Sequence, residues 1–189
     1  NNCKVLIRHD ILLYDNIRYF KYGRILMSAL FALGLGTGIC CGIWGAISSI
    51  PSLGLVTWIG FSGCTAYFAS GKHGLEGVKT AMLSTFSGMI SALIAIFISG
   101  LVPNLVAIPF IMTGIISATM CWQAKAKELW FIPGAFMGCF TTFGAMAMGI
   151  NVMSSEIVHV VLSLLCGGVL ALSCDKTGEF LLKKFGKEE

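Results

Sequence analysis

Six long apolar stretches constrain the fold of this chain more than any other feature. A helix needs about 20 mainly apolar residues to cross the ~30 Å hydrocarbon layer of a bilayer. The stretches cover, approximately, residues 25–50, 54–70, 80–102, 105–124, 130–149 and 157–174. The second is short and rich in glycine, so we expect it to be tilted, bent or partly re-entrant. The pattern predicts an all-α polytopic membrane protein with six transmembrane helices.

The composition agrees with a chain that has lipid as its main solvent. Hydrophobic residues make up 56% of the 189 residues and charged residues 12%, against about 45–50% and about 25% in soluble domains. We therefore expect the lipid bilayer to be the main partner, a homo-oligomer to be possible, and nucleic acid not to be a partner. Most cysteines lie in apolar runs and lack zinc spacing, which predicts no disulfide, no metal site and no cofactor.

The distribution of lysine predicts the orientation. Positive charge occurs in the loops after the second and fourth stretches and in the C-terminal tail, at Lys72, Lys79, Lys125, Lys127, Lys176, Lys183, Lys184 and Lys187. The connections around Pro51, Pro103 and Asn151 contain no Lys or Arg. Because cytoplasmic loops carry the excess of Lys and Arg, both termini are expected in the cytoplasm.

Three regions follow from this layout: an extension over 1–26, a six-helix domain over 27–174 and a basic cytoplasmic tail over 175–189. The extension is charged, and the first methionine, Met27, stands at the start of the first apolar run. Two interpretations stay open. The native protein starts at Met27, or the extension is a cytoplasmic amphipathic helix.

A repeated motif divides the domain into two halves. Residues 61–68 and residues 136–143 both read F-x-G-C-x-x-x-F, 75 positions apart, and the tripeptide Thr-Gly-Ile recurs at 37–39 and 113–115. Halves of about 27–102 and 103–174 would each hold three crossings. An odd number of crossings reverses the second half, so the sequence predicts a 3+3 inverted repeat.

Small and hydroxyl-bearing residues give the candidate packing faces and sites. A ladder of small residues on the first helix, Gly34, Gly38, Gly42 and Ala46, predicts close contact with a neighbouring helix. The repeat predicts that the second and fifth helices are adjacent and that the motif residues lie at matching depth, near the bilayer midplane: Gly63, Cys64, Gly138 and Cys139. Neutral polar stripes offer a lining for a narrow path, although hydroxyls can also bond to their own helix: Ser84, Ser87 and Ser91 on the third helix, Thr113 and Ser117 on the fourth.

Segments of the chain resemble a known family. Residues 42–45 (Gly-Ile-Trp-Gly), 58–69 and 131–134 (Phe-Ile-Pro-Gly) are similar to the YcdZ family of bacterial inner-membrane proteins, and the resemblance covers about residues 27–174. The family is a domain of unknown function. It implies an inner-membrane location and no catalytic residues.

Three classes of function remain open at this point. The first is a channel or facilitator for a small neutral solute, and the second is a non-transporting membrane partner or scaffold. The third and most remote is an intramembrane serine protease, because residues 60–63 read G-F-S-G and His159 lies on another helix. We expect no enzyme activity, since the second copy of the motif has Met137 in place of Ser62 and no histidine-glycine motif surrounds His159.

Overall fold

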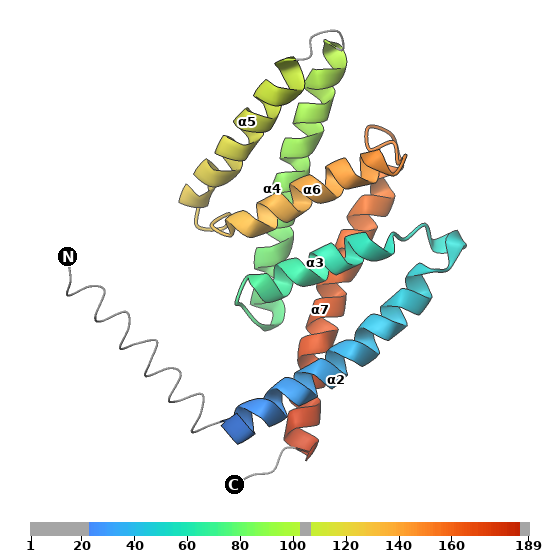
Figure 1. Cartoon of the computed structure of the whole chain (residues 1–189), viewed down its shortest axis with the longest axis vertical. Helices are drawn as coiled ribbons and strands as arrows, with labels where there is room; N and C mark the ends of the chain where they lie inside the picture. The colour runs from blue at the N-terminus through green and yellow to red at the C-terminus, as the bar shows by residue number, and fades with distance from the viewer. Residues whose placement is uncertain (1–22, 103–106, 186–189) are drawn as a thin grey trace, which may run out of the picture.

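The computed structural model describes residues 23–102 and 107–185 of the chain, and this part is built from helices (Figure 1). Its six α-helices confirm the predicted all-α fold. They are α2 (Gly23–Ser48), α3 (Thr57–Ala69), α4 (Gly74–Leu101), α5 (Ala107–Trp122), α6 (Ile132–Ala147) and α7 (Ile157–Phe185), with short 3-10 helices η1 (Pro51–Leu53) and η2 (Gln123–Lys125).

Four of the helices are long and apolar enough to cross a membrane: α2, α4, α5 together with η2, and α7. The other two are shorter. At ~1.5 Å per residue, the 13 residues of α3 and the 16 residues of α6 span only about 20 and 24 Å. The second stretch is therefore short as predicted, and the fifth is also shorter than its apolar run. In Figure 1 both short helices lie across the middle of the bundle, over α4 and α7.

The long and short helices pair in a regular way. The most extensive contacts join α4 to α6, α3 to α7 and α2 to α7. A second set joins α4 to α5, α3 to α4, α4 to α7 and α3 to α6, so the second and fifth predicted helices are adjacent as expected. In Figure 1, α2 lies along the C-terminal part of α7, and α5 lies along the C-terminal part of α4.

Glycines set the closest helix crossings. A Cβ on Gly138 would overlap the backbone of Thr85 in α4, and a Cβ on Gly88 would overlap the backbone of Ala135 in α6. On the other side of the bundle, a Cβ on Gly63 would come within 2.6 Å of the Leu164 carbonyl oxygen in α7. Residues without a side chain allow backbones to approach this closely.

The ladder on α2 is different, and the prediction that it packs against a neighbouring helix of the chain is wrong. Around Gly34, Gly38 and Gly42, no described atom beyond the neighbouring residues of α2 itself lies within 4 Å of where a Cβ would stand. All three glycines are exposed. Instead, α2 contacts α7 through its other face, where the backbone of Gly178 lies against Gly36.

The predicted boundary at residue 174 falls inside a helix. α7 continues without a break to Phe185, so most of the predicted basic tail is the last part of α7. Most of the predicted extension over residues 1–26 lies outside the described residues.

Candidate functional site

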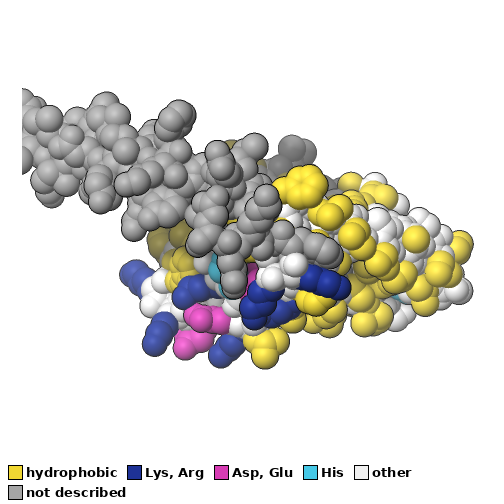
Figure 2. All heavy atoms as spheres, turned by 90° about the horizontal axis from the view of Figure 1, so that it is seen from below, with side chains coloured by type: hydrophobic (Ala, Val, Ile, Leu, Met, Phe, Trp, Pro, Cys, Tyr) yellow, Lys and Arg dark blue, Asp and Glu magenta, His cyan; other side chains and the backbone are white. Residues whose placement is uncertain are grey.

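Charged side chains gather at one end of the bundle. Figure 2 shows lysine and acidic side chains together on one part of the surface, and hydrophobic side chains over most of the remaining described surface in that view. We call this the lysine-rich end; it holds the α3–α4 turn, the η2–α6 connection and the part of α7 around Asp175, with Lys72, Lys79, Lys125, Lys127 and Lys176.

A cavity of about 590 Å³, which we call the vestibule, opens between α4 and the η2–α6 connection at this end. Its lining combines charged, aromatic and hydroxyl side chains: Lys72, Glu76, Lys79, Thr80 and Leu83 on one side, Lys127, Glu128 and Trp130 on the other. Lys72 and Glu76 form an exposed ion pair at 2.8 Å, which adds little stability because water screens both charges. Three lysines and two glutamates leave the walls with one net positive charge.

Ser84 lies one helical turn beyond Thr80, on the same face of α4, where side chains four positions apart are neighbours. Its side chain is fully buried, and its Oγ has no hydrogen-bond partner among the described residues. It stands against the start of α6, where a Cβ on Gly134 would come within 2.8 Å of the Ser84 Cβ. A buried hydroxyl without a partner costs about 1–3 kcal/mol. Such a group beside a cavity is a candidate ligand for a polar solute.

None of the predicted stripe residues, Ser84 included, is part of the cavity wall itself. Ser87 donates to the carbonyl of Ser84 at 2.8 Å, and Ser91 donates to the carbonyl of Ser87 at 3.0 Å. Thr113 is exposed on α5 and donates to the carbonyl of Pro109, and Ser117, four positions further along α5, is only half-buried. The structure therefore does not bring the two stripes together.

The four motif residues are placed at two separate crossings. Gly63 packs on α7, whereas Gly138 packs on α4. Cys64 lies in an apolar cluster with Trp44, Met82 and Cys174, and Cys139 lies in another with Ala92, Met112 and Met120. Both cysteines are buried among apolar neighbours, so these residues act as helix-packing positions in the structure.

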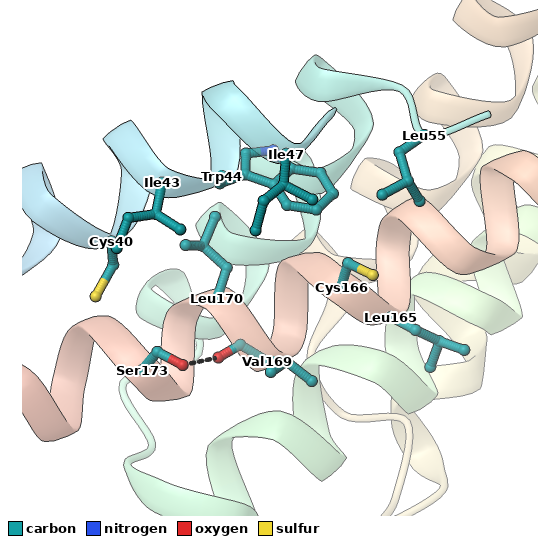
Figure 3. Close-up of a pocket in the computed structure, with 10 residues that line it drawn as sticks. All are labelled: Cys40, Ile43, Trp44, Ile47, Leu55, Leu165, Cys166, Val169, Leu170 and Ser173. Carbon is teal, nitrogen blue, oxygen red and sulfur yellow. Dashed lines mark hydrogen bonds between the residues drawn. The ribbon is translucent and has the colours of Figure 1, made fainter. Parts of the chain in front are cut away.

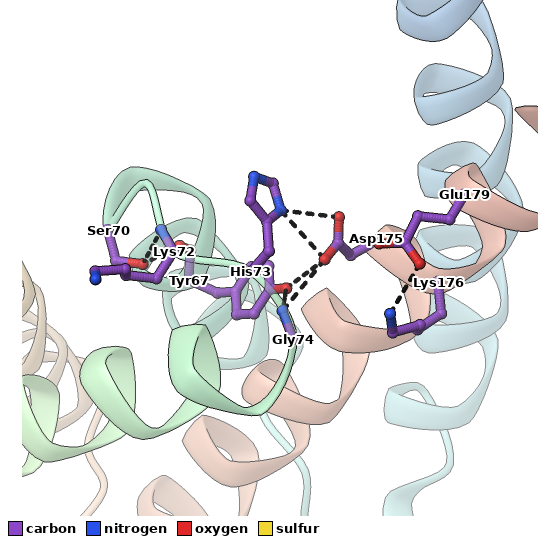
Figure 4. Close-up of polar contacts among 8 residues, drawn as sticks. All are labelled: Tyr67, Ser70, Lys72, His73, Gly74, Asp175, Lys176 and Glu179. Atoms are coloured by element: carbon purple, nitrogen blue, oxygen red, sulfur yellow. Dashed lines mark hydrogen bonds and ion pairs between the residues drawn. The ribbon is translucent and has the colours of Figure 1, made fainter.

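A second polar cluster, missed in the sequence analysis, surrounds Asp175 (Figure 4). The Tyr67 hydroxyl donates to Asp175 Oδ2 at 2.6 Å and accepts a hydrogen bond from the Gly74 amide at 2.7 Å. His73 Nδ1 lies 3.2 Å from Asp175 Oδ1, although its ring is largely exposed. Asp175 itself is only 5% exposed.

The Asp175 cluster joins α3 and α7 to the turn that connects α3 with α4. It holds the α3–α4 turn against α7, and the same turn carries Lys72 into the wall of the vestibule. The clue in the sequence was the spacing of Leu170, Ala171 and Cys174, which continues the buried face of α7 up to Asp175. Because the prediction ended the sixth helix at residue 174, it assigned Asp175 to the tail and not to this buried face.

An apolar groove of about 440 Å³ lies along the contact of α2 with α7 (Figure 3). Trp44 and Ile43 from α2 face Leu170 and Cys166 from α7 across it. Its lining is almost entirely hydrocarbon and sulfur, which suits contact with apolar chains and offers few groups for recognising a polar molecule.

The residues of the protease alternative do not meet. The Ser62 hydroxyl donates to the Trp58 carbonyl of its own helix at 3.2 Å, and the His159 ring lies against Gly54 in the α2–α3 connection. Within residues 23–102 and 107–185, no group of three or more His, Cys, Asp or Glu side chains is placed to hold a metal ion.

The fold and its surface define a multi-pass helical membrane protein with a polar vestibule at one end. The chain belongs to the family described as "Protein of unknown function (DUF1097)", whose model matches residues 34–179. The resemblance seen in the sequence is therefore confirmed.

Curated relatives extend this result. The chain is 43% identical over 117 residues to inner membrane protein YcdZ of Escherichia coli strain K12, covering 62% of this chain and 71% of the relative. It is 44% identical over 117 residues to inner membrane protein YcdZ of Salmonella typhimurium strain LT2, covering 62% and 72%. It is 32% identical over 131 residues to the uncharacterized protein YahC of Escherichia coli strain K12, covering 65% and 78%. No solved structure matches the chain.

Proposed function

We propose that the protein lets a small, uncharged, hydrogen-bonding solute cross the bacterial inner membrane, with the vestibule as its cytoplasmic entrance. The observation that carries this proposal is the buried, unpartnered hydroxyl of Ser84, one helical turn along α4 from Thr80 in the vestibule wall. The inner-membrane location rests on the names of the YcdZ relatives. By the positive-inside rule, the lysines at the vestibule end favour a cytoplasmic position for that end and for both chain termini.

The chemistry of the lining favours a solute without net charge. Beyond the charged rim, the polar side chains on this face of α4 are neutral: Thr80, which lines the vestibule, and Ser84, which is buried one turn further along. An ion that moved past them would lose its hydration without gaining a partner of opposite charge, at a large free-energy cost. A neutral solute could replace its water contacts with hydrogen bonds to these hydroxyls.

An inverted repeat is the second part of the proposal, and three regularities support it. The contacts of α3 with α7 and of α6 with α4 correspond when the halves are exchanged, and so do those of α2 with α7 and α5 with α4. Buried positions in α4 recur in α7 after 79 residues, at Ala81 and Val160, Ser84 and Ser163, Thr85 and Leu164, Gly88 and Gly167, Ala92 and Ala171. The glycine contacts recur in the same way, because Gly88 meets Ala135 and Gly167 meets Gly60.

In this arrangement the path is shut beyond Ser84. The crossing of Gly88 on Ala135 and of Gly138 on Thr85 brings the backbones of α4 and α6 together. A solute in the vestibule can therefore advance only when these helices move apart. Transport of this kind needs movement between two halves, which is how inverted-repeat transporters carry a solute past a site near the midplane.

Flux into liposomes tests the proposal. Purified protein in liposomes is challenged with urea, glycerol and erythritol in a stopped-flow swelling assay, with protein-free liposomes as the baseline. We expect flux of at least one solute above that baseline, and a loss of that flux in Ser84→Ala. Ser87→Ala is the matched control, since its hydroxyl is already bonded within α4. Baseline flux for every solute, or full flux in Ser84→Ala, would reject the facilitator.

A second candidate, a non-transporting membrane partner or scaffold, is favoured by the exposed glycine ladder of α2. Gly34, Gly38 and Gly42 present a face without described neighbours, of the small-xxx-small kind through which transmembrane helices associate. Disulfide cross-linking of Gly38→Cys in native membranes distinguishes the possible contacts. A homodimer product supports an oligomer, a product of higher mass supports another membrane protein, and no product leaves this face to lipid.

A further inference from the structure

We infer that Ser163 is the gate on the outer side of the proposed solute path and that this structure is the inward-open state. The inference deepens the proposed function, on which it rests. It depends on a difference between two positions, Ser84 and Ser163, that the repeat makes equivalent.

Ser84 and Ser163 have matching surroundings in the two halves, so their hydrogen bonds can be compared. Ser84 and Ser163 are both fully buried, and each is close to the start of a short helix. Ser163 contacts the start of α3 at Val56, and Ser84 contacts the start of α6. Val56 and Phe131 are separated by the same 75 residues as the two copies of the sequence motif.

The outer member of the pair is closed by hydrogen bonds. The Val56 amide donates to Ser163 Oγ at 2.8 Å, and Ser163 Oγ donates to the His159 carbonyl at 2.6 Å. Gly54 lies so close to the His159 ring that a Cβ there would overlap it, and its left-handed φ of 59° is one that glycine adopts readily. The connection between α2 and α3 is therefore fastened to α7.

The inner member lacks these hydrogen bonds. Ser84 Oγ is unpartnered within the described chain, and Thr80, one turn earlier on α4, lines the vestibule. Trp130, which corresponds to Leu55 of the outer connection, forms part of the vestibule wall. The connection before α6 thus leaves its serine free, whereas the connection before α3 binds its serine.

A carrier with alternating access requires two equivalent entrances, of which one is closed while the other is open. In the opposite state, the Phe131 amide would donate to Ser84 and the Val56 amide would leave Ser163. The protein would exchange one hydrogen bond for an equivalent one. The two states would then differ little in free energy, so that a solute could shift their populations.

Hydrogen–deuterium exchange on the full chain in nanodiscs tests this inference without any solute. In Ser163→Ala, we expect peptides over residues 50–56 to exchange about fivefold faster, the factor that corresponds to one typical net hydrogen bond. Peptides over residues 126–131 should exchange more slowly, because the inner connection closes as the outer one opens. Ser173→Ala is the control on α7, since its exposed hydroxyl only bonds the Val169 carbonyl.

The reciprocal change is the decisive result. Faster exchange at 50–56 with no slowing at 126–131 would show a local packing role and overturn the gate. Ser163→Cys, which is close in size and a weaker acceptor, should give the same two changes to a smaller extent and covers the case in which Ser163→Ala does not fold. If the exchange changes are reciprocal but the liposomes show no flux, the facilitator is rejected and the gate is kept. If the liposomes show flux but the exchange changes are not reciprocal, the gate is rejected and the facilitator is kept.

Discussion

The replacement Gly138→Ala tests the central helix crossing most directly. The added methyl would overlap the carbonyl of Thr85 and come within 2.9 Å of its Cα. These are backbone atoms inside a helix, so no side-chain rotation relieves the contact, and α4 and α6 must move apart. We expect the free energy of unfolding to fall by about 1–3 kcal/mol, the usual cost of overpacking, and by more if the Gly88 contact opens as well.

Gly38→Ala is the matched control. It makes the same chemical change in a helix interior, at a site where no described atom beyond the neighbouring residues of α2 lies within 4 Å of the new methyl. Replacing glycine by alanine in a helix stabilises by roughly 0.5–1 kcal/mol. The two variants should therefore differ by about 1.5–4 kcal/mol in unfolding free energy.

The readout is thermal unfolding in detergent, monitored by size-exclusion chromatography. For a chain of this size 1 kcal/mol corresponds to roughly 2–4 °C, so Gly138→Ala should melt at least about 3–6 °C below Gly38→Ala. Gly88→Ala should cost less in the Gly138→Ala background than alone, because both methyls separate the same two helices. Equal melting of Gly138→Ala and Gly38→Ala would refute the α4–α6 crossing.

Three further outcomes are expected. Tyr67→Phe removes a hydrogen bond to the buried Asp175 carboxylate and should destabilise by about 1–3 kcal/mol, with faster amide exchange at residues 71–75; unchanged exchange there would contradict the role of the cluster. Reporter fusions after Lys127 should report cytoplasm and fusions at Asn151 the outside, and the reverse would invert the proposed orientation. Thr113→Val should leave the melting temperature within about 1 °C, because Thr113 is exposed and bonds only its own helix; a larger fall would mean that this face is covered.

The sequence alone was sufficient for the helices but not for their faces. Apolar length is an average over many residues, and it predicted all six helices. Four of them lie within about three positions of their predicted bounds, whereas α4 begins six residues earlier and α7 ends eleven residues later than predicted. It is harder to predict which face of a helix packs against a neighbour, because in lipid both sides of a helix are apolar and the usual amphipathic contrast is absent. The glycines of α2 therefore looked like a packing face, and Thr113 looked like a lining residue, although both are exposed.

The polar sites depend on contacts between distant residues. Tyr67 and Asp175 are 108 positions apart, and neither residue alone indicates a cluster. Ser84 was named from its helical spacing with Ser87 and Ser91, yet only the structure separates the one unpartnered hydroxyl from two that bond to their own helix. The spacing of hydroxyls predicted a face, and tertiary packing decides which of them is available.

The packing of α2 on α7 has a consequence for how the protein is made. The first described helix finds its main partner in the last one, with Cys40 and Thr177 in contact across 137 positions of sequence. A ribosome adds about 5–20 residues per second, so α2 waits roughly 7–27 s after its own synthesis before that partner exists. During this interval its glycine face and its α7 face are both open to lipid and to the insertion machinery. Assembly of this bundle is therefore completed only after translation has reached α7, and truncation anywhere before α7 leaves α2 in the bilayer without its main partner.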